Sequence, residues 1–461
     1  MKTGEAFLLI QKAIQSGGEY ADVFLESKHQ THIVLENKTI DQIFSGKITG
    51  AAIRVISEFK NYLTITQDIS IPNLLKEANL LATSIKKNKR SPKSTTKGSA
   101  CGTSKISPPS SQVGLKKIVT HLKKIEKLAW KMSPHSVQVK LSYSDSLRAI
   151  EMATSDFSFL KQSTPQASFS VLITVSKKGK NFTGFHSLGG QFGSHFISLD
   201  AFEECALLAT QRAITNMSAK TITGGVMPVV ISSSSGGTLI HEAIGHGLEA
   251  DLALEGLSVY KNKLGEKVAS SKVTITDNPT LQGKRGSYMF DDEGIRAQNT
   301  ILIEKGILKN FLCDRLHALK FGLKSNAHGR REDFTAKPIV RMANTMMLPG
   351  PDDPQKILSS VNHGLFVTMM GGGEVNTVNG DFVFEVTEGY LIENGKKGEP
   401  VRGVSLVGNA AHVLASIDLV GSDFGFSVGT CEKDGQDVPI TDGMPTVRIP
   451  LLTVGGSTSN Q

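Results

Sequence analysis

The chain has 461 residues, of which 39% are hydrophobic and 20% are charged, and its formal net charge is +8. These values are typical of a globular protein with two or three domains, and no apolar run is long enough to cross a bilayer. The first residues lack a signal-peptide pattern, so a cytoplasmic protein without a membrane partner is expected. Four scattered cysteines (Cys101, Cys205, Cys313 and Cys431) exclude a disulfide framework and suit a reducing compartment.

The first 85 residues predict an antiparallel sheet with flanking helices. Residues 4–16 and 71–85 have the apolar spacing of helices. Asn37-Lys38 and Ser45-Gly46 look like hairpin turns between short strands. The expected strands are residues 20–26, 31–36, 40–44, 50–57 and 61–66.

The excess positive charge lies in residues 86–131, which hold thirteen Lys or Arg and one acidic residue, Glu126. Residues 86–112 lack periodicity and are rich in Lys, Ser, Thr and Pro, so a mobile basic loop is expected. Residues 113–131 predict a basic amphipathic helix, which more often packs its apolar stripe on a sheet than meets a membrane or nucleic acid. Further strands are expected in 136–195, and another helix over 199–217.

A turn-rich stretch at Thr221–Gly225 predicts a domain boundary. The sequence therefore indicates an α+β fold with a sheet-plus-helices domain over residues 1–220. A strand-rich domain over 221–461 would follow and carry a metal-site helix. Within it, Asn379-Gly380 and Asn394-Gly395 are strong hairpin signals.

That helix holds His241, Glu242 and His246. An apolar run and a serine-glycine stretch precede it, so we predict a strand, a loop and a helix capped by Ser234 or Ser235. A hydrolytic zinc site needs two imidazoles to hold the ion and a carboxylate to take a proton from the metal-bound water. The alternative is that the histidines are ordinary polar positions on a buried helix, since such short patterns recur by chance.

The spacing of the histidines requires a distorted helix. They stand five residues apart, which on a regular helix separates them by roughly 140°. Both can face one ion only if the helix widens into a π-bulge or breaks near Gly245. Gly245 and Gly247 would permit either distortion.

Several C-terminal motifs accompany this helix. They are His241-Glu-Ala-Ile-Gly-His246, Phe290-Asp-Asp-Glu-Gly294, Gly329-Arg-Arg331, Arg341-Met-Ala-Asn-Thr345, Gly371-Gly-Gly-Glu-Val-Asn376, Gly380-Asp-Phe-Val-Phe384 and Gly429-Thr-Cys-Glu-Lys-Asp-Gly-Gln436. Together they resemble the TldD/PmbA family of metallopeptidases over residues 225 to about 440, while the N-terminal half agrees more loosely. Because the metal motif is present, the chain resembles the TldD-type peptidase branch and not the motif-less branch.

The resemblance implies one zinc ion per active subunit, held by His241, His246 and Cys431. Glu242 would act as general base. Cys431 stands among glycines in an expected loop, from which a thiolate could reach the ion. Cys313 lies in an apolar run typical of an inert thiol.

Two acidic residues beyond His246, Glu249 and Asp251, are candidates for orienting an imidazole. A solvated helix end is the equal alternative.

The resemblance also implies an unfolded or extended peptide as substrate, which a strand edge could bind through its backbone. Gly371, Gly372 and Gly373 would admit a peptide backbone, or they form a plain turn. His328 and Arg330 could polarise a carbonyl.

The family resemblance implies a dimer, either a homodimer or a heterodimer with a motif-less PmbA/TldE-type paralogue. A second possible function is a non-catalytic regulator that binds a partner protein or nucleic acid through residues 86–131, since family members have been named modulators of DNA gyrase. That segment lacks interleaved aromatic residues and any nucleic-acid motif, so nucleic acid is not the expected partner.

Overall fold

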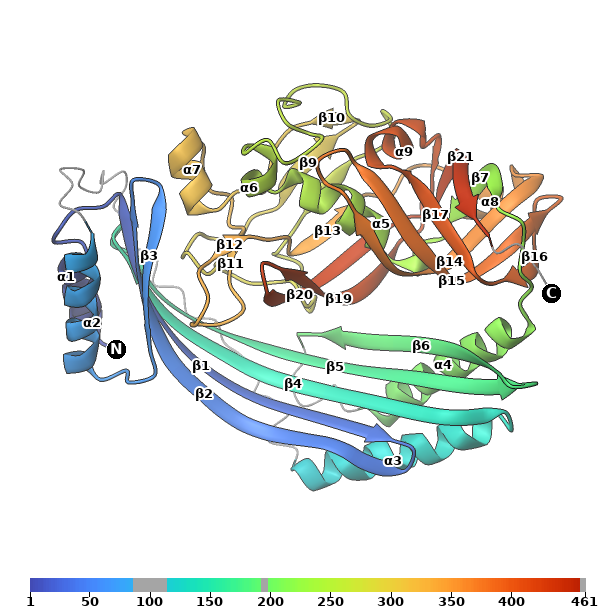
Figure 1. The fold of residues 1–461 in the computed structure, drawn as a ribbon, viewed down its shortest axis with the longest axis horizontal. Coiled ribbons are helices and arrows are strands. Elements are labelled where there is room, and N and C mark those ends of the chain that lie inside the picture. The colour runs from blue at the N-terminus through green and yellow to red at the C-terminus, as the bar shows by residue number, and fades with distance from the viewer. Residues whose placement is uncertain (86–113, 192–197, 457–461) are drawn as a thin grey trace.

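The computed structural model describes residues 1–85, 114–191 and 198–456 (Figure 1). It confirms the α+β class. The basic loop expected at 86–112 lies outside the described residues. The helices are α1 (Thr3–Ala13), α2 (Ile71–Ser84), α3 (Leu115–Met132), α4 (Leu199–Ser218), α5 (Thr238–Ile240), α6 (Ala250–Ala253), α7 (Arg315–Phe321), α8 (Pro354–Ser359) and α9 (Ala410–Ser416). No helix among these described residues is long and apolar enough to span a membrane.

The strands form one sheet in the N-terminal half and the remaining sheets in the C-terminal half. The N-terminal strands are β1 (Tyr20–Glu36), β2 (Thr39–Ser57), β3 (Lys60–Thr66), β4 (Ser136–Thr154), β5 (Phe159–Lys177) and β6 (Lys180–Gly190). The C-terminal strands are β7 (Gly225–Ile231), β8 (Ile275–Asp277), β9 (Thr300–Glu304), β10 (Ile307–Leu308), β11 (Gly329–Arg330), β12 (Ile339–Val340), β13 (Asn344–Met347), β14 (His363–Val375), β15 (Asp381–Glu393), β16 (Lys396–Val401), β17 (Val404–Asn409), β18 (Leu419–Val420), β19 (Gly425–Lys433), β20 (Gln436–Met444) and β21 (Val447–Gly455).

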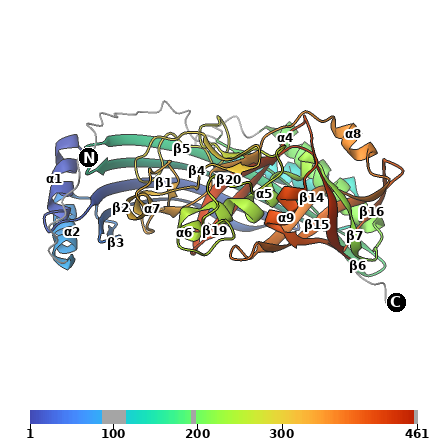
Figure 2. The same cartoon turned by 90° about the horizontal axis from the view of Figure 1, so that it is seen from above.

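The N-terminal strands form an antiparallel sheet in the order β3-β2-β1-β4-β5-β6. Helices α3 and α4 cover one face of it, and α1 and α2 lie at its far end (Figures 1 and 2). Alternate side chains of β4 and β5, such as Val139, Tyr143 and Phe169, are buried against the apolar stripes of α3 and α4. The expected basic helix therefore packs its stripe on the sheet.

The short strands expected before residue 57 merge into two long ones. The turn predicted at Ser45-Gly46 is wrong, because Ser45 pairs with Thr31 and Gly46 with Gln30 inside the β1–β2 ladder. The turn at Asn37-Lys38 is confirmed, and both residues have positive φ, 49° and 70°. A glycine beside a polar residue weakens a strand without ending it.

Two main sheets form most of the C-terminal half. One has the order β10-β9-β8-β13-β20-β19, and the other runs β14-β7-β21-β17-β15-β16, with β14 also pairing β15. They share one apolar core, which also buries the segment around His241. The hairpin at Asn394-Gly395 is confirmed, and the loop that contains Asn379-Gly380 joins the paired strands β14 and β15.

A buried ion-pair network joins the two halves and accounts for one of the motifs. Arg54 of β2 binds Asp22 at 2.6 Å and Glu293 at 2.8 Å. Arg148 of β4 binds Asp292 at 2.9 Å. The Phe290–Gly294 motif therefore anchors the C-terminal half to the N-terminal sheet.

Candidate metal centre

The metal motif follows β7 through a short serine turn. Ser233–Ser235 form a 3₁₀ turn of their own, with the Ser232 hydroxyl accepting from the Ser234 N–H. Helix α5 begins after Gly237, whose residue type offers no side-chain cap. The predicted cap by Ser234 or Ser235 is therefore wrong, because the serines close the preceding turn instead.

The predicted distortion of the helix is confirmed. His241–Gly245 form a π-helical turn (η4), and His246–Leu248 form a 3₁₀ turn directly after it (η5). The extra residue in the π turn brings the two imidazoles to the same side, with ring centroids 5.1 Å apart.

Gly245 is required by close packing. A Cβ at this position would lie 1.9 Å from Sδ of the fully buried Met342. We expect Gly245→Ala to destabilise the fold by about 1–3 kcal/mol through overpacking, which urea unfolding would measure. Gly372→Ala is the matched control, since a Cβ there meets no atom within 4 Å. Equal stability of the two variants would contradict this account of Gly245.

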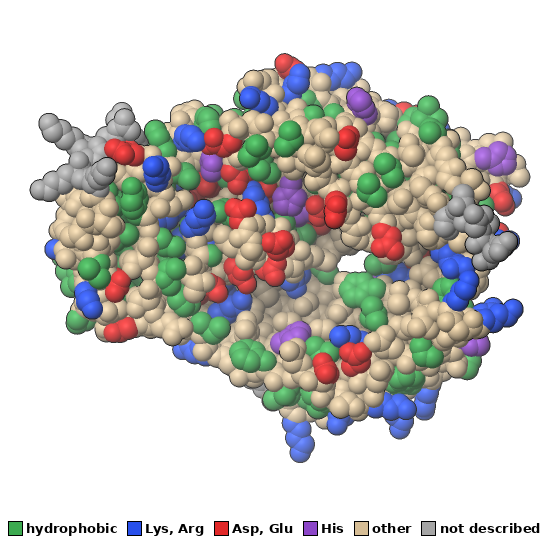
Figure 3. Space-filling model, in the orientation of Figure 1, with side chains coloured by type: hydrophobic (Ala, Val, Ile, Leu, Met, Phe, Trp, Pro, Cys, Tyr) green, Lys and Arg blue, Asp and Glu red, His purple; other side chains and the backbone are tan. Residues whose placement is uncertain are grey.

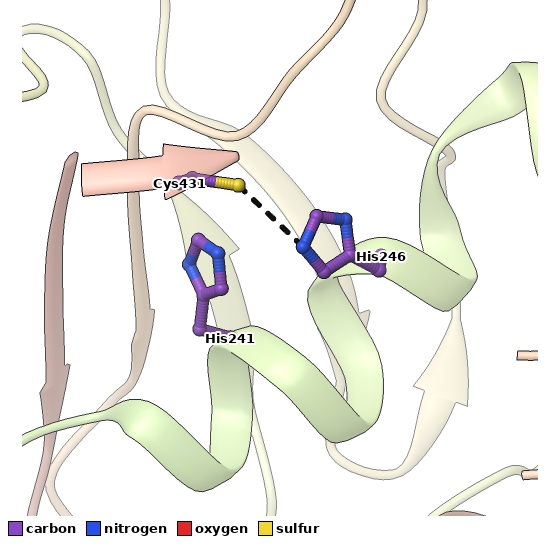
Figure 4. Close-up of side chains that lie close together, drawn as sticks. All are labelled: His241, His246 and Cys431. Carbon is purple, nitrogen blue, oxygen red and sulfur yellow. Dashed lines mark hydrogen bonds between the residues drawn. The ribbon is translucent and has the colours of Figure 1, made fainter. Parts of the chain in front are cut away.

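The structure brings His241, His246 and Cys431 together. Their possible ligand atoms all lie within 4.8 Å of one another. Sγ of Cys431 is 3.5 Å from Nε2 of His246, and the three side chains converge (Figure 4). Cys431 lies within strand β19 and is only 5% exposed, so its expected loop position is wrong. The strand, held in register by β20, fixes the thiol above the helix.

Each imidazole uses its Nδ1 to bind a carboxylate. Nδ1 of His241 lies 2.9 Å from Oδ1 of Asp442, and Nδ1 of His246 lies 2.9 Å from Oε2 of Glu249. Because a carboxylate only accepts, each Nδ1 carries the hydrogen and each Nε2 is left to bind a ligand. Sequence reasoning selected Glu249 but missed Asp442.

Asp251 has a different role from the one considered for it. Its carboxylate binds Nζ of Lys433 at 2.7 Å, and the same ammonium group binds Glu249 at 2.9 Å. Burial raises the pKa of Glu249, but the charge of Lys433 and then that of His246 lower it to about 2. Lys433 thus keeps Glu249 ionised as the partner of His246.

The electrostatics of the three residues suit a metal ion. Burial raises the pKa of the Cys431 thiol, but hydrogen bonds with His241 and His246, together with their charges, lower it to about 5. The neighbouring imidazoles therefore favour the thiolate, the form of cysteine that binds a metal ion. A thiolate and two imidazoles are the donors that transition-metal ions prefer, while magnesium prefers oxygen.

Glu242 lies beside these residues without joining their hydrogen bonds. Its Oε2 is 3.9 Å from Nε2 of His246, and its side chain is 30% exposed. Burial raises the pKa of Glu242, and the charges of His241 and His246 oppose that shift. A positioned carboxylate with a raised pKa is a stronger base than an ordinary one.

Glu242 and His241 line a cavity of about 620 Å³ between the two halves of the molecule. Its walls include β6 and α4 of the N-terminal half and β14, β15 and β19 of the C-terminal half. Figure 3 shows the opening between the halves. In the described sheets β6 and β19 are both outermost strands. The cavity therefore lies between two strand edges.

The glycine run contributes unequally to this cavity. Gly371 and Gly372 line it, in a part of β14 where the register with β15 shifts. A Cβ on Gly373 would lie 2.0 Å from Cδ1 of Phe384, so that glycine serves packing. These residues form an irregular strand and not a plain turn.

His328 and Arg330 lie away from the residues that line this cavity. His328 is fully buried, with Nε2 3.2 Å from Oδ1 of Asp277. Arg330 donates to the backbone carbonyls of Met342 and Pro439. These contacts occupy both side chains, so the structure offers no support for their expected action on a substrate carbonyl.

Comparison with known proteins identifies the family to which the chain belongs. The chain matches the domains described as PmbA/TldA metallopeptidase domain 1, central domain and C-terminal domain over residues 21–82, 108–217 and 224–456. It is 32% identical to a Buchnera aphidicola protein named "Metalloprotease TldD homolog", across 98% of this chain and 96% of that protein. It is 30% identical to a Saccharolobus solfataricus "Zinc metalloprotease TldD homolog", across 73% of this chain and 76% of that protein.

Solved structures share the whole fold. A candidate modulator of DNA gyrase from Thermotoga maritima superposes with a TM-score of 0.80 at 21% identity, covering 98% of this chain and 99% of its own. TldE from Thermococcus kodakarensis superposes with a TM-score of 0.75 at 17% identity, covering 98% and 100%. With all three family domains matched and the fold shared throughout, the chain belongs to the PmbA/TldD family of metallopeptidases.

Proposed function

We propose that this protein is a zinc-dependent peptidase of the His-Glu-x-x-x-His type, acting on unfolded or extended peptides. The observation that carries the proposal is the convergence of His246 and Cys431, 185 positions apart in sequence, with His241. Two imidazoles and a thiolate would supply three protein ligands for one zinc ion per active subunit. Three ligands leave a fourth position open, as in catalytic zinc sites.

Zinc in this site would lower the pKa of a coordinated water and polarise a peptide carbonyl. Glu242 is the general base, because its carboxylate faces the cavity and is not held by an ion pair with Lys or Arg in the described part of the chain. It takes a proton from the attacking water and passes it to the leaving amine. Asp442 and Glu249 hold the imidazoles in the orientation that exposes Nε2.

The edge of β19 supports an extended substrate. A peptide lying along the outer edge of β19 could pair with its backbone, and such pairing reads the backbone more than the side chains. On β6 the carbonyls of Thr183 and Phe185 already accept from Asn216 and Arg212. Gly371 and Gly372 leave room on the wall formed by β14. A folded protein has few free backbone groups, so the cavity favours unfolded chains.

Removal and return of the metal test the proposal directly. We expect the zinc-loaded protein to hydrolyse an unstructured fluorogenic peptide. Chelation should abolish the activity, and stoichiometric zinc should restore it. A metal-free protein that cleaves at the full rate would contradict the proposal.

Asp442→Asn tests the role of the carboxylate behind His241. An asparagine side chain can present its NH₂ group to Nδ1 and so disturb the tautomer, and loss of such a partner typically lowers metal affinity about 10–100-fold. Competition with a zinc-binding dye would measure the change. The control is Asp437→Asn, an exposed position on the same strand. If the Asp442 variant and the wild-type protein bind zinc with equal affinity, Asp442 does not support the metal site.

We further propose a cytoplasmic enzyme that works as a dimer, with a second copy or a motif-less TldE-type partner. Similarity to a TldE structure supports such a pairing. The division into domains 1–220 and 221–461 is part of the same proposal.

One observation favours the alternative regulatory function. Helix α3 exposes six lysines, which at about 100° per residue fall within an arc of about 120°. They are Lys116, Lys117, Lys123, Lys124, Lys127 and Lys131. Only Lys124 forms an ion pair among the described residues, at 3.6 Å from Glu203. Two proteins of the same fold are described as candidate modulators of DNA gyrase, which is a further reason to test a regulatory function.

A triple variant separates the two functions. The regulatory function predicts that duplex DNA binds less tightly as salt rises and is lost when Lys123, Lys124 and Lys127 become glutamine. The peptidase function predicts that the same variant keeps its hydrolysis rate. Gel shift and peptide assays would measure both. The control replaces three exposed lysines outside helix α3, Lys261, Lys263 and Lys267.

A further inference from the structure

Arg285 is a half-buried arginine without a carboxylate partner in the described part of the chain. Its Nη2 donates to Oγ1 of Thr430 at 3.4 Å. Its Nε is buried and has no hydrogen-bond partner among the described residues. Burial lowers the pKa of Arg285, and no neighbouring charge counters that shift.

Other arginines bind a carboxylate or two backbone carbonyls, although Arg331 and Arg341 also have nitrogens without a hydrogen-bond partner among the described residues. Arg54, Arg148 and Arg331 pair with carboxylates. Arg330 and Arg341 donate to backbone carbonyls. A guanidinium withdrawn from water without a partner is costly. Arg285 therefore has the contacts expected of a side chain whose partner is a ligand.

Arg285 lines two small cavities beside the one that holds His241 and Glu242. It lines cavities of about 190 Å³ and about 100 Å³ between the N-terminal sheet and β19–β20. Thr430, which contacts Arg285, lines both the larger of these and the cavity that holds His241 and Glu242. Thr430 of β19 therefore stands beside both the metal-centre cavity and Arg285.

Arg285 contacts the strand that carries Cys431. Thr430 is the neighbour of Cys431 in β19, and its side chain reaches Arg285. A peptide paired with the β19 edge would pass Thr430, whose side chain contacts Arg285.

We propose that Arg285 binds a carboxylate of the peptide substrate, either the C-terminal carboxylate or an Asp or Glu side chain. This inference rests on the proposed peptidase function. A guanidinium presents a planar fork that matches a carboxylate. Lys28 lines both smaller cavities with Arg285, and Arg148, Arg330 and Arg331 also line the smaller of the two. Glu332 and Asp437 on the same walls disfavour more than one anionic group.

Peptide binding measured without turnover tests this site. In the zinc-loaded Glu242→Ala protein, fluorescence anisotropy would give Kd for a labelled peptide with a free C-terminus and one acidic residue. Analogues would have the C-terminus amidated, the acid replaced by its amide, or both. We expect the carboxylate-bearing peptide to bind about tenfold or more tightly than the doubly neutral one, the range of a charge-assisted hydrogen bond.

Arg285→Gln should bring the ratio of those two Kd values close to one. Arg285→Lys, which keeps the charge without the fork, should retain part of it and serves as the test if the glutamine variant does not fold. Arg296→Gln, at an exposed position on the same connection between β8 and β9, should keep the full ratio. The single analogues show which carboxylate Arg285 binds.

A ratio that survives both Arg285 substitutions, or a wild-type ratio near one, would overturn the assignment. The outcome is distinct from failure of the peptidase function. If the protein with Glu242 intact cleaves no peptide, the proposed function fails, whereas the Kd ratios still decide whether Arg285 binds a carboxylate.

Discussion

Replacing Glu242 with alanine is expected to lower peptide hydrolysis by about 10²–10⁴-fold, the contribution typical of a positioned general base. The zinc content should not change, because Glu242 is not among the three converging donors. A stopped assay with a fluorogenic peptide, run beside metal analysis of the same sample, measures both quantities.

Glu374→Ala provides the control for this experiment, since it removes an exposed carboxylate that follows the glycine run of β14. It should hydrolyse peptide at the wild-type rate. If the Glu242 variant also keeps the wild-type rate with zinc bound, the general-base role is wrong even if the metal site is real.

Replacing Cys431 with serine is expected to remove zinc from the purified protein. A serine hydroxyl stays protonated at neutral pH, so the site would lose the negative charge that the Cys431 thiolate supplies. Loss of an outer hydrogen-bond partner already lowers metal affinity about 10–100-fold. Loss of a ligand should exceed that, and hydrolysis should fall with the zinc content.

Cys205→Ala is the matched control, because Cys205 is a buried thiol on α4 that contacts the backbone carbonyl of His186. Burial raises the pKa of that thiol to about 12, so it does not supply a thiolate at neutral pH. Its loss should leave one zinc per subunit. A Cys431 variant that binds zinc as tightly as wild type would exclude the thiol from the site.

The distorted helix could be predicted from sequence because the evidence is local. Two histidines five positions apart cannot share one face of a regular helix, and Gly245 marks where it deforms. The observed π turn follows from that constraint. Helices α3 and α4 could be predicted equally well, because their apolar spacing is strong and uninterrupted.

The partner of His241 could not be found in the same way. Asp442 lies 201 positions away, on a strand that packs against the helix only in the folded chain. The one available signal was an acidic residue, between Thr441 and Gly443, just after the short apolar stretch Val438–Ile440. Buried carboxylates are rare without a partner, so a strand-borne aspartate is a reasonable candidate for such a role.

Residues near the family motifs were the hardest to interpret. Arg330 and His328 stand in a polar stretch that sequence alone does not distinguish from a substrate site, yet they satisfy backbone and buried carboxylate groups. In the N-terminal half, Ser45-Gly46 has the composition of a turn, but the long ladder between β1 and β2 overrides it. In both cases, contacts that form only in the folded chain determine the role of the residues.

X-ray absorption at the zinc edge of the purified protein tests the central claim most directly. If His241, His246 and Cys431 hold one ion, the spectrum will show one sulfur at about 2.3 Å and two imidazole nitrogens at about 2.0–2.1 Å. A first shell without sulfur, or with nitrogen and oxygen ligands that persist in the Cys431 variant, would contradict the shared site.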